Sequence, residues 1–176
     1  MAKLVITADI HGSVMVWEKI RGILRPDDTL AVAGDLFDTK YRSRGEDDYK
    51  PDFIKNEFSH LPNTRYYVYG NCDTEDYLTG YSLQCSFQYQ GFSIILNHGH
   101  RPLPDLTDYH IIIEGHSHIP RLDTLMGKVF LNPGSPFWPR STYPSYATLA
   151  DNIIQIIDFS DNRTVTELHL DDCIHQ

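Results

Sequence analysis

Short apolar segments alternate with polar ones over the first part of the chain. Residues 3–8 and 30–33 are mostly apolar and have the length of buried strands. Between them, Ser13 is suited to cap a helix, and the apolar residues after it recur at helical spacing as far as Leu24. A strand, a helix and a strand in this order predict a βαβ unit, and hence a sheet with parallel strands.

The rest of the chain indicates one more helix and a series of short strands. Residues 39–51 are polar and charged, which predicts a surface loop at a strand end. A helix is expected over residues 52–60 and a strand over residues 66–69. Further strands are expected at 85–90, 92–96, 110–114, 129–131, 147–150 and 153–159, several of them joined by turns at 90–91, 126–128 and 151–152.

This alternation of strands and helices places the fold in the α/β class. The chain contains no internal repeat, no low-complexity tract and no change of composition that would mark a linker. We therefore expect one domain that spans residues 1–176.

The composition narrows the possible functions. With 15 Lys and Arg against 24 Asp and Glu, the formal charge is −9, which disfavours a long nucleic acid as a partner because phosphate binding needs clustered cations. Three widely spaced cysteines give neither a disulfide framework nor a zinc knuckle, which fits a reducing, cytoplasmic location. No signal peptide is visible and no stretch approaches the roughly 20 apolar residues of a membrane helix, so no membrane association is expected.

Five polar clusters follow expected strands. Each combines Gly with Asp, Asn or His, which together turn the backbone sharply and offer metal-binding atoms. The clusters are 9–12 (DIHG), 34–38 (GDLFD), 70–73 (GNCD), 97–100 (NHGH) and 115–118 (GHSH). Because ligands bind at strand ends in α/β sheets, these clusters are candidate parts of one site.

Carboxylates and imidazoles in this pattern indicate a site for divalent metal ions. A single carboxylate can bridge two ions about 3.5 to 4 Å apart, the spacing used in phosphoryl displacement, and Asp35 is the natural bridge. Taken singly, each cluster is ordinary turn chemistry or a histidine pair, but five of them in order favour the metal site. The histidines without such a context are expected to be structural: His60, His110, His169 and His175.

The order D-x-H, G-D-x-x-D, G-N-x-D, H-G-H, G-H-x-H resembles that of the calcineurin-like metallophosphoesterases. Within that family the chain is similar to the small bacterial YfcE-type phosphodiesterase branch, from residue 3 to about residue 159 and including the segment 132–135 (NPGS). The resemblance implies a four-layer αββα sandwich of two mixed β-sheets flanked by helices, with a dinuclear metal centre. One metal would be held by Asp9, His11, Asp35 and His118, and the other by Asp35, Asn71, His98 and His116.

The resemblance also implies the reaction. A hydroxide that bridges the two metals would attack phosphorus in line, without a covalent enzyme intermediate. Mn²⁺ is the metal we expect, and Mg²⁺, Fe, Zn²⁺ and Ni²⁺ are alternatives because all accept nitrogen and oxygen ligands. The residues expected to take part in catalysis are Asp35, Asn71 and His100.

Cys72 departs from the pattern of the wider family. Many relatives carry a histidine there that contacts the phosphate and protonates the leaving group, a role that a thiol cannot take over. His100 is a candidate substitute or phosphate contact, with a hydrogen bond to a metal ligand as the alternative. Asp73 is a candidate to orient Asn71, but capping of a helical turn at 74–77 is the role we favour.

Substrate contacts are expected from side chains at the mouth of the site. An arginine and an aromatic side chain beside a phosphate suit a nucleobase or aryl group and a second phosphate oxygen. The expected phosphate contacts are Asn71, Cys72, His100 and Arg140, and the candidate walls are Tyr41, Arg42 and Arg44 on one side and Phe137, Trp138 and Arg140 on the other.

The sequence favours a metal-dependent phosphodiesterase that acts on small phosphate diesters. A phosphomonoesterase or protein phosphatase of the same superfamily is one alternative, weakened because no histidine stands at Cys72. A non-catalytic scaffold related to the retromer subunit of this fold is another, weakened because all seven expected ligands are present. The resemblance also suggests a homodimer or tetramer.

Overall fold

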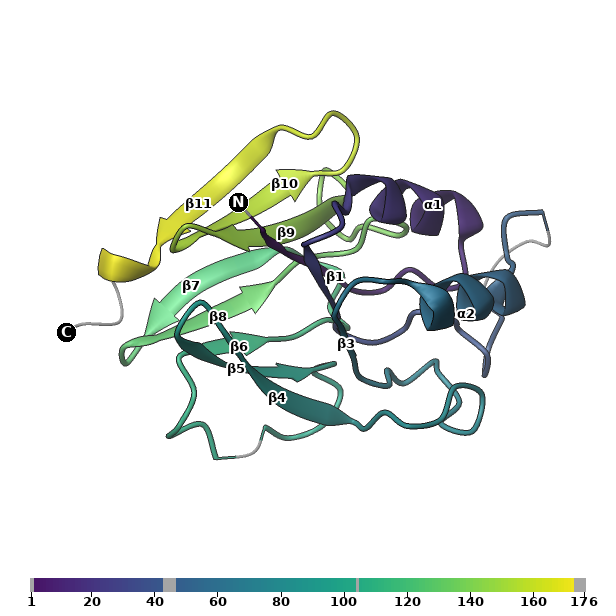
Figure 1. The fold of residues 1–176 in the computed structure, drawn as a ribbon, viewed down its shortest axis with the longest axis horizontal. Coiled ribbons are helices and arrows are strands. Elements are labelled where there is room, and N and C mark those ends of the chain that lie inside the picture. The colour runs from purple at the N-terminus through teal and green to yellow at the C-terminus, as the bar shows by residue number, and fades with distance from the viewer. Residues whose placement is uncertain (1, 43–46, 104, 173–176) are drawn as a thin grey trace.

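Two β-sheets packed face to face form most of the structure, a computed structural model that describes residues 2–42, 47–103 and 105–172 (Figure 1). The first sheet has six strands in the order β11-β10-β9-β1-β2-β3. β1, β2 and β3 are parallel to one another, whereas β9, β10 and β11 each run antiparallel to the neighbour on the β1 side. The strand bounds are β1 Leu4–Thr7, β2 Thr29–Val32, β3 Arg65–Tyr67, β9 Ser145–Ala150, β10 Ile153–Asp158 and β11 Thr164–His169.

The second sheet has five strands in the order β4-β5-β6-β8-β7. Its three central strands are parallel, and the two outer strands are antiparallel to them. Both sheets are therefore mixed, as the sequence predicted. The strand bounds are β4 Gln84–Tyr89, β5 Phe92–Asn97, β6 Ile111–Ile113, β7 Arg121–Leu125 and β8 Lys128–Asn132.

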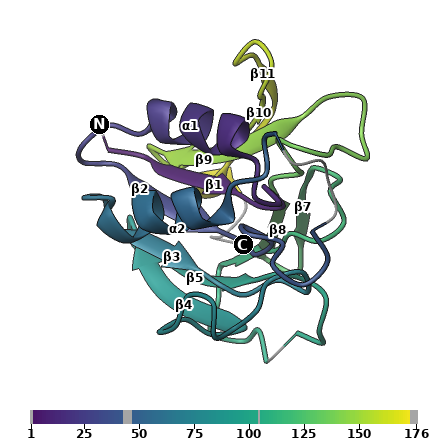
Figure 2. The ribbon, with the colours of Figure 1, turned by 90° about the vertical axis from the view of Figure 1, so that its right-hand side faces the viewer.

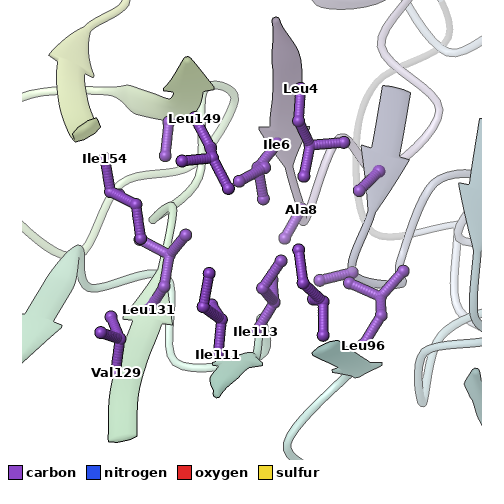
Figure 3. Packing of buried hydrophobic residues seen from close by; sticks show 14 of the residues in the cluster. Leu4, Ile6, Ala8, Leu96, Ile111, Ile113, Val129, Leu131, Leu149 and Ile154 are labelled. Atoms are coloured by element: carbon purple, nitrogen blue, oxygen red, sulfur yellow. The ribbon is translucent and has the colours of Figure 1, made fainter. Parts of the chain in front are cut away.

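The main hydrophobic core lies between the two sheets. Figure 3 shows Ile6 and Leu149 of the first sheet facing Ile111 and Ile113 of the second. All four side chains are buried, because alternate residues of each strand point into this interface. Burial of apolar area stabilises this interface by about 25 cal/mol per Å², and so holds the two sheets together.

Two α-helices, α1 (Val14–Ile23) and α2 (Pro51–His60), cover the other face of the first sheet (Figure 2). Ser13 caps α1 as expected, since its hydroxyl accepts a hydrogen bond from the Val16 N–H at 3.2 Å. Trp17 of α1 and Phe58 of α2 meet edge to face with ring centroids 5.9 Å apart. Among the described residues, no helix has the length and hydrophobicity needed to cross a membrane.

The outer face of the second sheet is covered differently. In the described residues both α-helices lie on the first sheet, and a loop over residues 105–110 lies beside β5 and β8 instead of a further α-helix. Ser93 of β5 donates a hydrogen bond to the Asp108 carbonyl at 2.7 Å, and Lys128 of β8 donates one to the Tyr109 carbonyl at 2.8 Å. In the described residues, one of the two helical layers of the expected four-layer sandwich is thus present, the one on the first sheet.

The elements predicted from the sequence are all found, with ends that differ by one or two residues, but two strands were missed. These are β7 and β11, which form outer edges of the two sheets. Most of their side chains are exposed, so neither strand carries the apolar run or the alternation by which the other strands were recognised. The predicted turn at 126–128 is the hairpin between β7 and β8.

The aromatic contact between the helices gives a first prediction. We expect Trp17→Ala to lower the free energy of unfolding by about 3–5 kcal/mol, because the side chain is fully buried and would leave a cavity. Met15→Ala, on the exposed side of the same helix, is the control and should change stability by less than about 0.5 kcal/mol. Urea denaturation of both variants makes the comparison, and equal effects would contradict the packing described for α1.

Candidate metal centre

The five polar clusters all meet at one edge of the paired sheets. They follow β1, β2, β3, β5 and β6, which are parallel strands within their sheets, so their carboxyl ends lie together. Backbone hydrogen bonds join neighbouring clusters, with Asp9 N–H donating to the Gly34 carbonyl at 3.0 Å and Gly115 N–H to the His98 carbonyl at 3.2 Å. Between the sheets, the His116 N–H donates to Asp9 Oδ2 at 3.0 Å.

Asp9, His11 and His118 form one compact group of buried ligand atoms. His118 Nε2 lies 3.3 Å from Asp9 Oδ1 and 3.3 Å from His11 Nε2. His118 Nδ1 donates to the Trp138 carbonyl at 2.7 Å, which leaves Nε2 as the atom that faces the group. The first predicted ligand set is thus brought together by residues more than 100 positions apart.

Asp9, Asp35 and His98 form a second compact group. His98 Nε2 lies 3.3 Å from Asp35 Oδ2, and its Nδ1 donates to the Ala33 carbonyl at 2.7 Å. Asn71 Oδ1 lies 3.1 Å from His98 Nε2. Asp35 Oδ2 is also 3.9 Å from His11 Nε2, so this carboxylate faces both groups, in the position predicted for a bridge.

His100 and His116 lie at the open side of this second group. The ring centroid of each is 5.2 Å from that of His98. His116 is exposed and His100 is half-buried, whereas His98 is fully buried. The nitrogens of His116 lie outside the compact groups found among the described residues, so this predicted ligand is the most peripheral of the histidines in the set.

A divalent cation fits between these groups. Asp9 Oδ1 is buried and has no hydrogen-bond partner among the described residues, which is costly for a carboxylate oxygen unless a cation binds it. The same oxygen faces three imidazole nitrogens at 3.3–4.0 Å, and carboxylate with imidazole is a donor set that Mn²⁺, Fe and Zn²⁺ accept. The buried Asp and His clusters are consistent with a site for two metal ions.

The charges of the protein groups depend strongly on one another. Burial alone would lower the pKa of His98, but the hydrogen bond and negative charge of Asp35 outweigh it and raise the pKa to about 9. Burial would likewise raise the pKa of Asp35, and the hydrogen bond and positive charge of His98 instead hold it well below its usual range. The two side chains therefore form a buried ion pair until a metal competes for them.

The backbone of the candidate ligands is strained. Left-handed backbone conformations are disfavoured for residues with a Cβ and cluster at functional sites, at about 1–3 kcal/mol each. Here they turn the chain sharply just beyond a strand, so that two side chains of one cluster point to the same place. The φ angles are 56° at Asp9, 52° at His11, 51° at Asp35, 67° at His116 and 60° at His118.

Two further aspartates lie at the site. The sequence predicts no role for Asp38, and the role that it favours for Asp73 is wrong. Asp38, the last residue of the 34–38 cluster, has Oδ2 3.5 Å from His11 Nδ1 and forms a third compact group with His11 and Cys72. Asp73 does not cap the turn at 74–77, because both of its carboxylate oxygens accept hydrogen bonds from other groups, Phe37 N–H to Oδ1 at 2.9 Å and the Tyr67 hydroxyl to Oδ2 at 2.7 Å among them. The Asp73 carboxylate instead binds backbone amides beside Asp35, a partner that sequence spacing could not reveal.

The residues predicted to contact the substrate lie around the candidate metal ligands, and the structure connects them to those ligands by fewer contacts. Cys72 is buried, and burial together with the charge of Asp35 raises the pKa of its thiol, which rules out an easily formed thiolate. Arg140 is exposed, and its backbone N–H donates to the His118 carbonyl at 3.2 Å. Phe137 lies beside His11 and Trp138 beside His118, with ring centroids 6.4 and 6.2 Å apart.

The other predicted wall is only partly described. Arg42 lines a cavity of about 840 Å³ together with Tyr49, Phe53 and Tyr77. Tyr41 is exposed, and Arg44 lies outside the described residues.

Two of the histidines expected to be structural are His110 and His175. His110 accepts the Ser93 N–H through Nδ1 at 3.0 Å, and His175 lies outside the described residues.

Fold and site together define a metallophosphoesterase, and the chain belongs to the calcineurin-like phosphoesterase superfamily, whose domain model matches residues 2–152. It is 26% identical to Phosphodiesterase YfcE of Escherichia coli (strain K12) over 181 residues, which cover 96% of this chain and 98% of the relative. The predicted family and its YfcE-type branch are thereby confirmed.

Solved structures show the same fold. A structure of Yfce, a phosphoesterase from E. coli, matches with a TM-score of 0.81 and 22% identity, over 96% of this chain and 99% of that one. Wild-type Vps29 complexed with Zn²⁺ from Entamoeba histolytica matches with a TM-score of 0.63 and 22% identity, over 96% and 99% of the two chains. At this level of identity the likeness concerns the fold alone.

The close approach of the second and third clusters gives a prediction. A Cβ on Gly70 would overlap the carboxylate and backbone nitrogen of Asp35, so Gly70→Ala should displace that ligand and weaken Mn²⁺ binding by at least about tenfold. Gly22→Ala is the matched control, because a Cβ there meets nothing within 4 Å and should stabilise α1 by about 0.5–1 kcal/mol. Calorimetric titration with Mn²⁺ and thermal unfolding test both variants, and normal metal binding by Gly70→Ala would contradict the geometry.

The pKa of His98 gives a second prediction. A metal must displace the His98 proton below about pH 9, so Mn²⁺ affinity should rise with pH by up to about tenfold per unit until that pH is reached. Titrations in buffers of different ionisation enthalpy would measure the protons released on binding. An affinity that is constant between about pH 7 and about pH 9, with no proton release, would show that His98 is already neutral there and would contradict the ion pair with Asp35.

Proposed function

We propose that the chain is a metal-dependent phosphodiesterase that hydrolyses small phosphate diesters. The observation that carries this proposal is the position of Asp35, whose carboxylate faces both compact groups of candidate ligands. Membership of the phosphoesterase superfamily supports the reaction class. The choice of a diester draws support from the relative named as a phosphodiesterase and from the residue at position 72.

The charge of the site suits a phosphate substrate. Two divalent ions would supply Lewis-acid charge to the phosphate and lower the pKa of a water molecule. Because Asp9 and Asp35 are the only carboxylates of the predicted ligand set, two such ions would leave it at about +2, enough to attract an anion despite the formal charge of −9 of the chain.

The side chains around the candidate metal atoms limit what proton transfer the protein can supply. The Cys72 thiol has a raised pKa and is buried, so it serves neither as a nucleophile nor as a cationic proton donor. Burial lowers the pKa of His100, so this imidazole is neutral at pH 7. A neutral His100 can orient a phosphate oxygen or water by hydrogen bonding. The site is therefore suited to esters whose leaving group needs little protonation.

Asn71 would have two roles in this proposal. Its Oδ1 faces His98 Nε2 at 3.1 Å, where it would share a metal, and its Nδ2 donates to Cys72 Sγ at 3.2 Å. The second bond fixes which end of the amide faces the metal position. Asn71 is half-buried, so the same side chain borders the space that a substrate would enter.

Hydrolysis of model esters tests the proposal. With Mn²⁺ added, bis(4-nitrophenyl) phosphate should be hydrolysed faster than 4-nitrophenyl phosphate, and Asp35→Asn and His98→Ala should each lower the diester rate by at least about 100-fold. His60→Gln, an exposed histidine on α2, should leave the rate unchanged. Full activity after removal of metal would refute the metal-dependent reaction. Faster hydrolysis of the monoester would instead favour the phosphomonoesterase alternative.

A further inference from the structure

Asp73 is a buried carboxylate whose hydrogen bonds connect two of the candidate ligand loops. Only 1% of its surface is exposed, and it lies at the end of the loop that follows β3. Its two oxygens accept five hydrogen bonds. The donors are the backbone N–H groups of Phe37 (2.9 Å) and Asp38 (3.3 Å) to Oδ1, and those of Leu36 (3.3 Å) and Gly70 (3.1 Å) with the Tyr67 hydroxyl (2.7 Å) to Oδ2.

These donors stand directly beside candidate metal ligands. Residues 36–38 follow Asp35 without a gap, and Gly70 immediately precedes Asn71. The Asp73 carboxylate therefore binds the backbone next to Asp35 and the backbone next to Asn71. All five partners donate, so the carboxylate accepts hydrogen bonds from both loops at once and fixes their relative positions.

A second bond runs in the opposite direction between the same loops. Asp35 Oδ1 accepts the Cys72 N–H at 2.8 Å, which leaves Oδ2 to face His98 and His11. Each loop thus provides a carboxylate that binds amides of the other loop. Asp35 combines this bond with a place in the candidate metal groups, whereas Asp73 lies outside the compact groups of the described residues.

We propose that Asp73 is a positioning residue of the metal centre, which sets metal affinity by holding the Asp35 and Asn71 loops together without itself binding a metal. The inference rests on the metal centre of the proposed function. It assigns to the buried carboxylate a role in ligand geometry, beyond filling space in the core, and metal affinity is therefore the quantity to measure.

The variant Asp73→Asn changes the hydrogen bonds while keeping the shape of the side chain. An amide nitrogen in place of Oδ2 can donate to the Tyr67 hydroxyl, but it cannot accept from Leu36 or Gly70. One of the three bonds to the Asp35 loop is then lost together with the bond to Gly70, while Oδ1 still accepts from Phe37 and Asp38. We expect Asp73→Asn to bind Mn²⁺ about 10- to 100-fold more weakly in calorimetric titration. In the double variant with Tyr67→Phe the new amide loses its acceptor, so the affinity should fall further.

A control variant separates positioning from general loss of stability. Ile154→Ala changes a fully buried side chain of β10 in the core between the sheets, and it should bind Mn²⁺ with wild-type affinity even though it unfolds at a lower urea concentration. If Ile154→Ala weakens binding as much as Asp73→Asn does, the effect of Asp73 is only structural and the inference fails. Wild-type affinity in Asp73→Asn would also overturn it.

Two further outcomes are informative. If Asp73→Asn does not fold, Tyr67→Phe decides, because it removes one bond to Oδ2 and introduces no new polar group. It should weaken Mn²⁺ binding by about two- to fivefold, and an unchanged affinity would refute the inference. Failure of the wild-type protein to bind Mn²⁺ would instead refute the proposed function.

Discussion

The contact between Asp35 and His98 joins the ends of the two sheets. Asp35 follows β2 of the first sheet and His98 follows β5 of the second, and the 3.3 Å between their side chains fixes how the two edges meet. The second bond of His98, to the Ala33 carbonyl, ties the same ring to the backbone of the opposite sheet. The candidate metal centre depends on this alignment, since its other ligands come from loops on both sides of the contact.

The apolar core makes this costly arrangement possible. Buried carboxylates and imidazoles destabilise a fold unless they are paired, and several of them are gathered at one edge here. The layer of aliphatic side chains between the sheets, with Ile6, Ile111 and Ile113 at its centre, lies next to that edge and holds the two strand ends in register (Figure 3). A rigid scaffold beside a strained polar site is the general solution for enzymes built on paired sheets.

Much of this fold could be predicted from the sequence, because central strands carry apolar runs and end in Gly-rich clusters. β7 and β11 were missed, since edge strands are exposed on most sides and have no such run. The candidate ligands Asp9, Asp35 and His98 were found because each stands within three residues after the end of a strand. The role of Asp73 could not be predicted in the same way. Most of its partners are backbone amides more than 30 residues away, and nearly every residue has such an amide, so the sequence does not distinguish them.

The left-handed backbone of five candidate ligands links the site to the history of such a domain. Each of these positions costs stability that a glycine would recover, so the same residues serve the chemistry and weaken the fold. A copy under no selection for metal binding would gain stability wherever glycine replaced one of these ligands, whereas most other residues with a Cβ would keep the strain. These positions lie just beyond strand ends, so such changes would remove candidate ligands and leave the apolar core between the sheets intact.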